Sequence, residues 1–183
     1  MCIRDRLEEL RAAGERRDVE AVEATWSDLP RSAKRLPQAV AAYVRALMTA
    51  GQHETAEKLL REAIDDDPAH ASRELVRLYG ELAAPDPLAA LERAEQWLRA
   101  APEDAEWLAT CARLALQAEL IGKARGYLEA SIARKPTPDT SLLYAELLEH
   151  LGEGERARGV LRSYLERAAG RGLALPRMRL RRR

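Results

Sequence analysis

Three alanines, Ala56, Ala124 and Ala157, are each followed four residues later by a leucine. The first two alanines are 68 residues apart, which is two periods of 34 residues. Self-similarity at a fixed period of about 20 to 50 residues is the sequence signature of repeat proteins. A single repeat cannot bury its apolar face alone, so stacked neighbours bury it together. This repetition restricts the chain to an array of short stacked units.

Residues 36–68 show how one unit is built. Apolar residues at i, i+3, i+4 and i+7 predict the core face of a first helix. These residues are Val40, Tyr43, Val44 and Leu47. Gly51 is expected to end that helix. A second apolar stripe consists of Ala56, Leu59, Leu60 and Ala63, and Pro68 closes the unit. The unit is therefore predicted to be a helix, a glycine turn, a second helix and a proline.

The small residue in the second helix has a structural purpose. Two antiparallel helices approach closely only where side chains are small, so Ala56 is expected at the helix contact. The small residue, the glycine turn and the closing proline resemble the tetratricopeptide repeat, a helical hairpin of 34 residues. Ala, Leu, Glu and Arg dominate the composition, which favours helices over strands. We expect an all-α fold, a right-handed superhelical solenoid of antiparallel helical hairpins with a concave groove lined by the first helices.

The repeat register divides the chain into hairpins and a tail. A degenerate helical hairpin is expected in residues 1–35. Tetratricopeptide-like repeats are expected at about 36–69, 70–103, 104–137 and 138–169, before a basic tail at 170–183. The unit at 70–103 is irregular because the sequence AAPDP separates its helices. Within it, Asp86 and Pro87 are predicted to be the N-cap and the first residue of the following helix.

The net charge of the chain is zero, but it is unevenly distributed. Residues 171–183 contain six arginines and no acid, which leaves 24 basic against 30 acidic residues elsewhere. The mildly acidic body is a poor candidate for general nucleic-acid binding. The tail is expected to be disordered. Contact with anionic lipid is the alternative for the tail, and nucleic acid is a weaker one.

The ends of the chain and its cysteines set further limits. No apolar run reaches the roughly 18 residues that span a bilayer, so the chain as written is expected to be soluble. The opening MCIRDR fits no helix start well, and we expect the native N-terminus to lie upstream. Two cysteines, Cys2 and Cys111, imply no disulfide framework. Cys111 is predicted to be a buried structural thiol.

Residues that carry chemistry are scattered along the chain. His53, His70 and His150 have no metal-ligand spacing and no cysteine at close range, so they are interpreted as solvated loop and cap residues. A haem or metal ligand among them is the alternative. No nucleophile with a basic partner and no acid–base pair stands out. The chain is therefore predicted not to be an enzyme, and haem is the one cofactor left open.

Six polar side chains are expected to point into the groove from the first helices. They are Gln38, Arg45, Arg77, Glu81, Arg113 and Glu146. The three arginines are a candidate track for a partner's carboxylates. The pattern itself favours the other reading, in which charged groove residues pair with each other, as Arg77 would with Glu81 four residues later in the same helix.

Longer phrases resemble one particular family. The most specific are LYGEL, DPL and AEQWL around the irregular loop, and GKARGYLEAS at 122–131. Over about residues 20–167 the chain resembles the C-terminal repeats of the bacterial HemY-type haem-biosynthesis protein. The resemblance implies an inner-membrane protein that is associated, without catalysis, with the late protoporphyrin-to-haem steps. Two N-terminal hydrophobic helices of that family are absent from this sequence.

Three functions follow from these patterns. The leading hypothesis is a non-catalytic scaffold that binds late haem-pathway enzymes at the bacterial inner membrane. The second is a haem or porphyrin carrier in which arginines hold the propionates and one histidine is axial. The third is a general helical-repeat assembly scaffold. End hairpins without capping helices also suggest a homo-oligomer.

Overall fold

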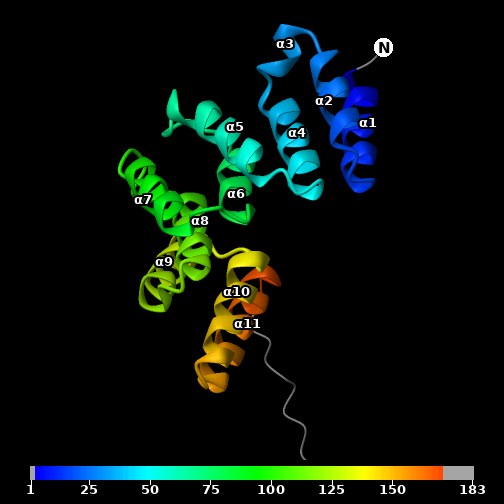
Figure 1. Ribbon diagram of the computed structural model, residues 1–183. Helices are drawn as coiled ribbons and strands as arrows, with labels where there is room; N and C mark the ends of the chain where they lie inside the picture. Colours follow the sequence, from blue (N-terminus) through cyan, green and yellow to red (C-terminus); the bar gives the residue numbers. More distant parts are fainter. Residues whose placement is uncertain (1–2, 171–183) are drawn as a thin grey trace, which may run out of the picture. The chain divides into compact units, whose positions relative to one another are not determined.

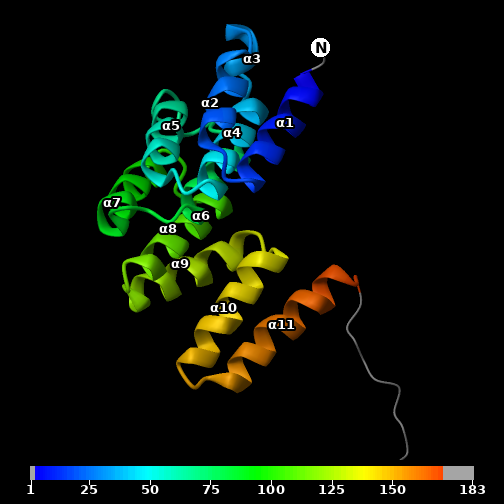
Figure 2. The same cartoon turned by 45° about the vertical axis from the view of Figure 1, so that its right-hand side comes forward.

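A computed structural model describes residues 3–170, which form eleven α-helices and contain no strand (Figures 1 and 2). The expected all-α class is confirmed. The helices belong to two compact units, of which the first ends at Arg134 and the second begins at Lys135. Cys2 and the arginines of the expected tail at 171–183 lie outside the described residues.

The first unit contains nine helices among its described residues. They are α1 (Ile3–Glu15), α2 (Val19–Ser27), α3 (Arg31–Lys34), α4 (Pro37–Thr49), α5 (His53–Asp65), α6 (Arg73–Glu81), α7 (Pro87–Leu98), α8 (Ala105–Gln117) and α9 (Ile121–Arg134). The helices α1, α4, α6 and α8 pack side by side in that order and form one layer. The helices α2, α5, α7 and α9 pack against them as the second layer.

Small residues set the distance between helices of the first layer. A Cβ atom added at Gly14 of α1 would lie 2.8 Å from the Cα atom of Ala46 in α4. A Cβ atom added at Gly80 of α6 would lie 3.0 Å from the Cα atom of Thr110 in α8. In the second layer, the predicted contact residue Ala56 is completely buried. These helices approach one another closely because glycine and alanine stand at the contacts.

Four hairpins share one turn geometry. The left-handed residue of the turn is Arg17, Gly51, Glu119 or Gly152, each with a positive φ between 56° and 82°. The next amide donates to a carbonyl five residues back, at 3.1 Å for Asp18 to Ala13 and 2.8 Å for Gln52 to Leu47, Leu120 to Ala115 and Glu153 to Leu148. This bond pattern satisfies the last carbonyls of the first helix.

The irregular unit is held by a residue from the next hairpin. Gln117, the last residue of α8, donates from Nε2 to the carbonyl oxygens of Leu82 at 2.8 Å and Gly80 at 3.2 Å. Its Oε1 accepts from the backbone amide of Ala84 at 3.1 Å. The predicted N-cap is confirmed, because Asp86 accepts from the amide of Ala89 at 3.0 Å. The AAPDP loop is therefore fixed by hydrogen bonds at both ends.

Aromatic side chains fill the space between α6 and α7. The rings of Tyr79 and Trp97 meet edge to face at 4.9 Å, and Trp97 lies 5.5 Å from Trp107 of α8. The indole of Trp97 donates to Oδ1 of Asp65 at 2.8 Å. Asp65, exposed at the end of α5, thus also holds the indole of the next hairpin's second helix. One correction concerns the second stripe of α5, where Ala63 is exposed and the neighbouring Ile64 is buried.

Up to Gly170, where the described residues end, the second unit contains one helical hairpin, α10 (Pro138–His150) and α11 (Gly154–Ala168). The start of α10 is a capping box, in which the amide of Thr140 donates to Oγ1 of Thr137 at 3.1 Å and the amide of Thr137 donates to Oγ1 of Thr140 at 3.2 Å. The core side of α10 includes Tyr144, Ala145 and Leu148, which are buried. In α11, by contrast, Ala157 is the one residue that is fully buried.

Candidate protein-binding surface

Each helix of the first layer carries an arginine at a similar place in its repeat. These residues are Arg11 on α1, Arg45 on α4, Arg77 on α6 and Arg113 on α8. Arg11 and Arg45 are 34 residues apart, and Arg113 follows Arg45 by 68 residues. The sequence analysis missed Arg11 because the first hairpin departs from the repeat pattern. The 34-residue spacing was the signal that identifies it.

Two of the predicted groove arginines have acidic partners. Arg45 Nη1 lies 2.7 Å from Glu74 Oε1 on the neighbouring helix α6. Arg77 Nε lies 2.6 Å from Glu81 Oε1, so the pairing foreseen for these two residues is confirmed. The Arg45 and Glu74 side chains are 56% and 38% exposed. Ion pairs this exposed contribute about 0–1 kcal/mol, so a partner's carboxylate can replace Glu74 at little cost.

Arg113 differs from the other arginines in its burial. Its side chain is 13% exposed, and Nη1 lies 3.7 Å from Glu106 Oε1, beyond hydrogen-bond distance. The same Nη1 has no hydrogen-bond partner among the described residues. The position of Arg113 therefore does not support the expectation that it contacts a partner as Arg45 would.

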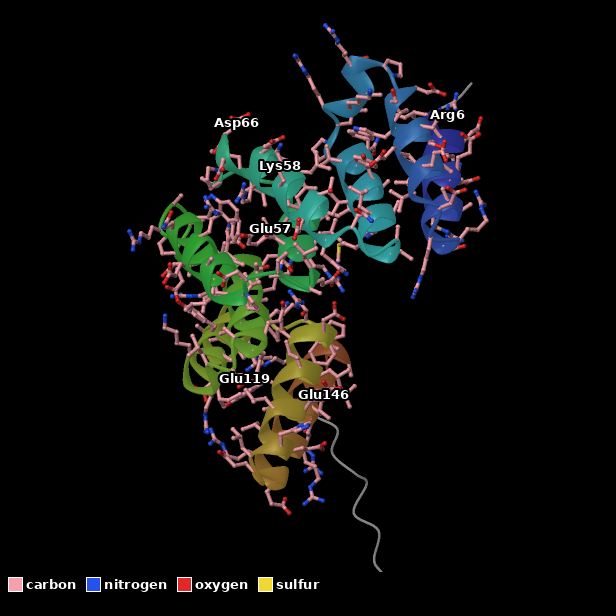
Figure 3. All side chains as sticks on the ribbon, viewed as in Figure 1. Arg6, Glu57, Lys58, Asp66, Glu119 and Glu146 are labelled. Atoms are coloured by element: carbon pink, nitrogen blue, oxygen red, sulfur yellow. The ribbon has the colours of Figure 1, made fainter. Side chains whose placement is uncertain are left out.

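The two remaining predicted residues are Gln38 and Glu146. Gln38 is exposed in the first turn of α4. Glu146 is exposed on α10 in the second unit, where it is labelled in Figure 3. The surface described below therefore belongs to the first unit alone.

A hollow of about 240 Å³ lies between α1 and α4. It is lined by Leu7, Arg11, Glu15, Ala42, Arg45, Ala46 and Thr49. Its apolar lining comes from Leu7, Ala42 and Ala46, and its charged groups come from the two arginines and the glutamate. A cavity of about 150 Å³ is large enough to hold a benzene ring in a protein core. This hollow therefore has room for one large apolar side chain beside two guanidinium groups.

The histidines lie on separate elements. His53 is half-buried at the start of α5, and its Nδ1 has no hydrogen-bond partner in the described part of the chain. His70 Nδ1 lies 3.0 Å from Asp67 Oδ2, and His150 Nδ1 lies 3.0 Å from the carbonyl oxygen of Glu146. None of the three lines the hollow between α1 and α4. Within residues 3–170, no three His, Cys, Asp or Glu residues are grouped as metal ligands.

Cys111 is buried on α8, as predicted. Burial raises the pKa of its thiol to about 12, and the nearby carboxylate of Glu95 adds to the effect. Lys123 lowers that pKa, but its ammonium group is held by Glu95 at 2.8 Å. A thiol with so high a pKa stays protonated at neutral pH and is a poor nucleophile.

Comparisons with solved structures identify the architecture. A thermophilic TPR protein of Thermus thermophilus, TTC0263, superposes with a TM-score of 0.61 at 19% identity, over 89% of this chain and 92% of that one. MamA, from residue 41 to its end, of Desulfovibrio magneticus RS-1 gives a TM-score of 0.56 at 17% identity, over 91% and 97%. The chain has the tetratricopeptide-repeat fold. A further MamA structure agrees, with a TM-score of 0.53 at 15% identity over 94% and 98%.

Sequence comparison adds no closer relative. No protein-family model matches the chain, and no curated protein matches it. The tetratricopeptide part of the sequence interpretation is therefore confirmed at the level of fold, whereas the HemY-type resemblance is not. No helix within residues 3–170 has the length and hydropathy needed to cross a membrane.

Proposed function

We propose that this protein is a non-catalytic scaffold whose first unit binds a segment of a partner protein. The observation that carries the proposal is the hollow between α1 and α4, where an apolar floor lies beside Arg11 and Arg45. Grooves of helical-repeat proteins bind peptides through apolar anchors and charged contacts. The segment that suits this hollow carries one large apolar side chain and an adjacent acidic residue.

The energetics favour such a segment. Full burial of a large apolar side chain contributes about 1.5–3 kcal/mol. The carboxylate of the partner would take the place of Glu74 at the guanidinium of Arg45, which is an exchange between similar ion pairs. Arg11 has a comparable exposed partner, Glu15, at 3.1 Å. The charged contacts therefore select an acidic segment, and the apolar contact supplies most of the affinity.

The resemblance to HemY-type proteins suggests a class of partner protein. We propose late haem-pathway enzymes at the bacterial inner membrane, held close together so that an insoluble porphyrin passes over a short distance. This finer statement rests on the shared phrases around the irregular loop and at 122–131. The partner-binding proposal rests on the hollow and does not depend on the haem pathway.

Affinity capture with identification by mass spectrometry tests both statements. The variant Arg11→Glu/Arg45→Glu reverses both charges in the hollow. The control, Lys58→Glu/Arg99→Glu, changes net charge equally at exposed positions on α5 and at the end of α7. We expect late haem enzymes to be recovered with the wild type and the control, and lost with the hollow variant.

Other results separate the two statements. If the wild type captures proteins outside the haem pathway and the hollow variant does not, the scaffold proposal stands and the haem-pathway proposal is wrong. Equal capture by the hollow variant and the wild type would contradict the proposed binding site. Co-purified haem, with a spectrum that changes on substitution of a histidine, would favour the carrier hypothesis instead.

A further inference from the structure

Among the described residues of the second unit, α11 packs on α10 alone, and its face with Leu161 and Leu165 is apolar. Ala157, Leu161 and Leu165 follow Ala56, Leu60 and Ile64 of α5 by 101 residues each. In α5 both Leu60 and Ile64 are completely buried. On α11 Leu161 is only partly buried, and Leu165 is 55% exposed. Two positions that are completely buried on α5 are therefore accessible on α11, where Leu161 is partly buried and Leu165 is exposed.

The open surface along this face is formed by Glu155, Arg158, Gly159, Leu161, Arg162 and Leu165. Gly159 lies near the middle of the helix, where glycine costs about 1 kcal/mol relative to alanine. A Cβ atom added there would meet nothing within 4 Å, so no contact in the described chain requires glycine. A glycine at the centre of an open face permits close approach of another backbone.

The charges on either side of Gly159 would be complementary between two copies of α11 related by a two-fold axis. Glu155 lies four residues before Gly159, and Arg162 lies three residues after it. Glu155 is paired with Arg158 in its own helix, whereas Arg162 has no ion pair among the described residues. When two copies of α11 cross antiparallel near Arg158 and Gly159, Glu155 of each copy faces Arg162 of the other. Two-fold interfaces are self-complementary in this way.

We propose that the partner of this face is a second copy of the chain, packed antiparallel along α11. The Leu161 and Leu165 side chains supply the apolar contact, and the two Glu155–Arg162 pairs set the direction of the helices. The same two-fold axis brings Leu165 near the turn at the start of the other copy's α11, where Leu151 is also exposed.

The size of the contact predicts a weak dimer. Fifteen residues of helix are about 22 Å long, and two helices of this length bury less than the roughly 1,200 Å² of a stable interface. We therefore expect dissociation in the micromolar range or above. Sedimentation velocity of the full chain, from low to high micromolar concentration, should show a rise from 20.4 kDa to twice that mass.

Charge exchange gives the decisive test. Glu155→Arg or Arg162→Glu alone places like charges together twice in each dimer, and should weaken dimerisation by about tenfold or more. The double variant Glu155→Arg/Arg162→Glu restores both pairs across the axis and should dimerise like the wild type. Leu165→Glu should abolish the dimer. Leu142→Glu is the matched control, since Leu142 is 52% exposed on α10 and is not among the six residues of this surface.

Several results would overturn the proposal. They are a monomer at every concentration, a dimer that both single charge reversals leave unchanged, or a double variant as weak as the single ones. If removal of residues 171–183 abolishes the dimer and the charge reversals have no effect on it, the dimer contact belongs to that segment instead. Helical content from circular dichroism checks that each variant is folded. None of these outcomes depends on the partner-binding hollow of the first unit.

Discussion

Substitution of Gln117 by alanine should destabilise the first unit more than the same substitution at any other glutamine of that unit. The side chain makes three hydrogen bonds, to the carbonyl oxygens of Gly80 and Leu82 and from the amide of Ala84. Each bond contributes about 0.5–1.5 kcal/mol. Alanine recovers a few tenths of a kcal/mol through its higher helix propensity. The expected loss in free energy of unfolding is therefore about 2–3 kcal/mol.

Urea denaturation followed by tryptophan fluorescence measures this loss in the relevant unit. All three tryptophans of the chain, Trp26, Trp97 and Trp107, belong to the first unit. With a slope of about 2 kcal/mol per molar urea, the midpoint should fall by about 1 M. Gln96→Ala is the control, because Gln96 is exposed on α7 and its substitution removes no comparable set of bonds. It should leave the midpoint within a few tenths of a molar.

A second substitution at the same position tests the physical reason. Gln117→Glu keeps the acceptor but replaces the amide donor by a carboxylate oxygen that faces two carbonyl oxygens. At neutral pH it should therefore be at least as destabilising as Gln117→Ala. Its deficit should shrink as the pH falls through the range in which carboxylates are protonated. A loss below about 0.5 kcal/mol for Gln117→Ala, or a harmless Gln117→Glu, would refute the reasoning.

Three further predictions concern backbone, packing and thiol chemistry. Glu119→Gly should raise stability by about 0.5–1 kcal/mol in the same assay, because Glu119 has a φ of 58° that glycine adopts without strain. Gly80→Ala should cost about 1–3 kcal/mol, since the added Cβ would lie 3.0 Å from the Cα atom of Thr110. In a Cys2→Ser background, Cys111 should react with a thiol reagent at pH 8 only after denaturation. Because folding raises the pKa of that thiol to about 12, its ionisation should destabilise the fold as the pH rises from about 8.5.

Repeated local patterns made much of the fold predictable. The small residue of each second helix marked a core position, and Ala56, Ala124 and Ala157 are completely buried. Gly51 marked one of the four left-handed turns, and Gly152 takes the same conformation in a second. The other two turns use Arg17 and Glu119, and neither residue type favours that conformation. Their geometry comes from the packing of the hairpins and leaves no local signal.

Long-range contacts were the part that sequence patterns did not reveal. Gln117 closes the irregular loop from 33 residues away, and Asp65 accepts a hydrogen bond from Trp97 across 32 residues. The pairing of Arg77 with Glu81 was predictable because both lie on one helix. The pairing of Arg45 with Glu74 and the burial of Arg113 depend on where neighbouring helices lie. Spacing along one helix carries no information about those distances.

The central claim is that a partner protein binds the first layer of helices at the hollow between α1 and α4. A photo-crosslinking amino acid at Thr49, which lines the hollow, tests it most directly in cells. The matched position is Lys58, which is exposed on α5 in the second layer and labelled in Figure 3. We expect partner proteins to be cross-linked from position 49 and not from position 58. Equal cross-linking from both positions, or cross-linking from position 58 alone, would contradict it.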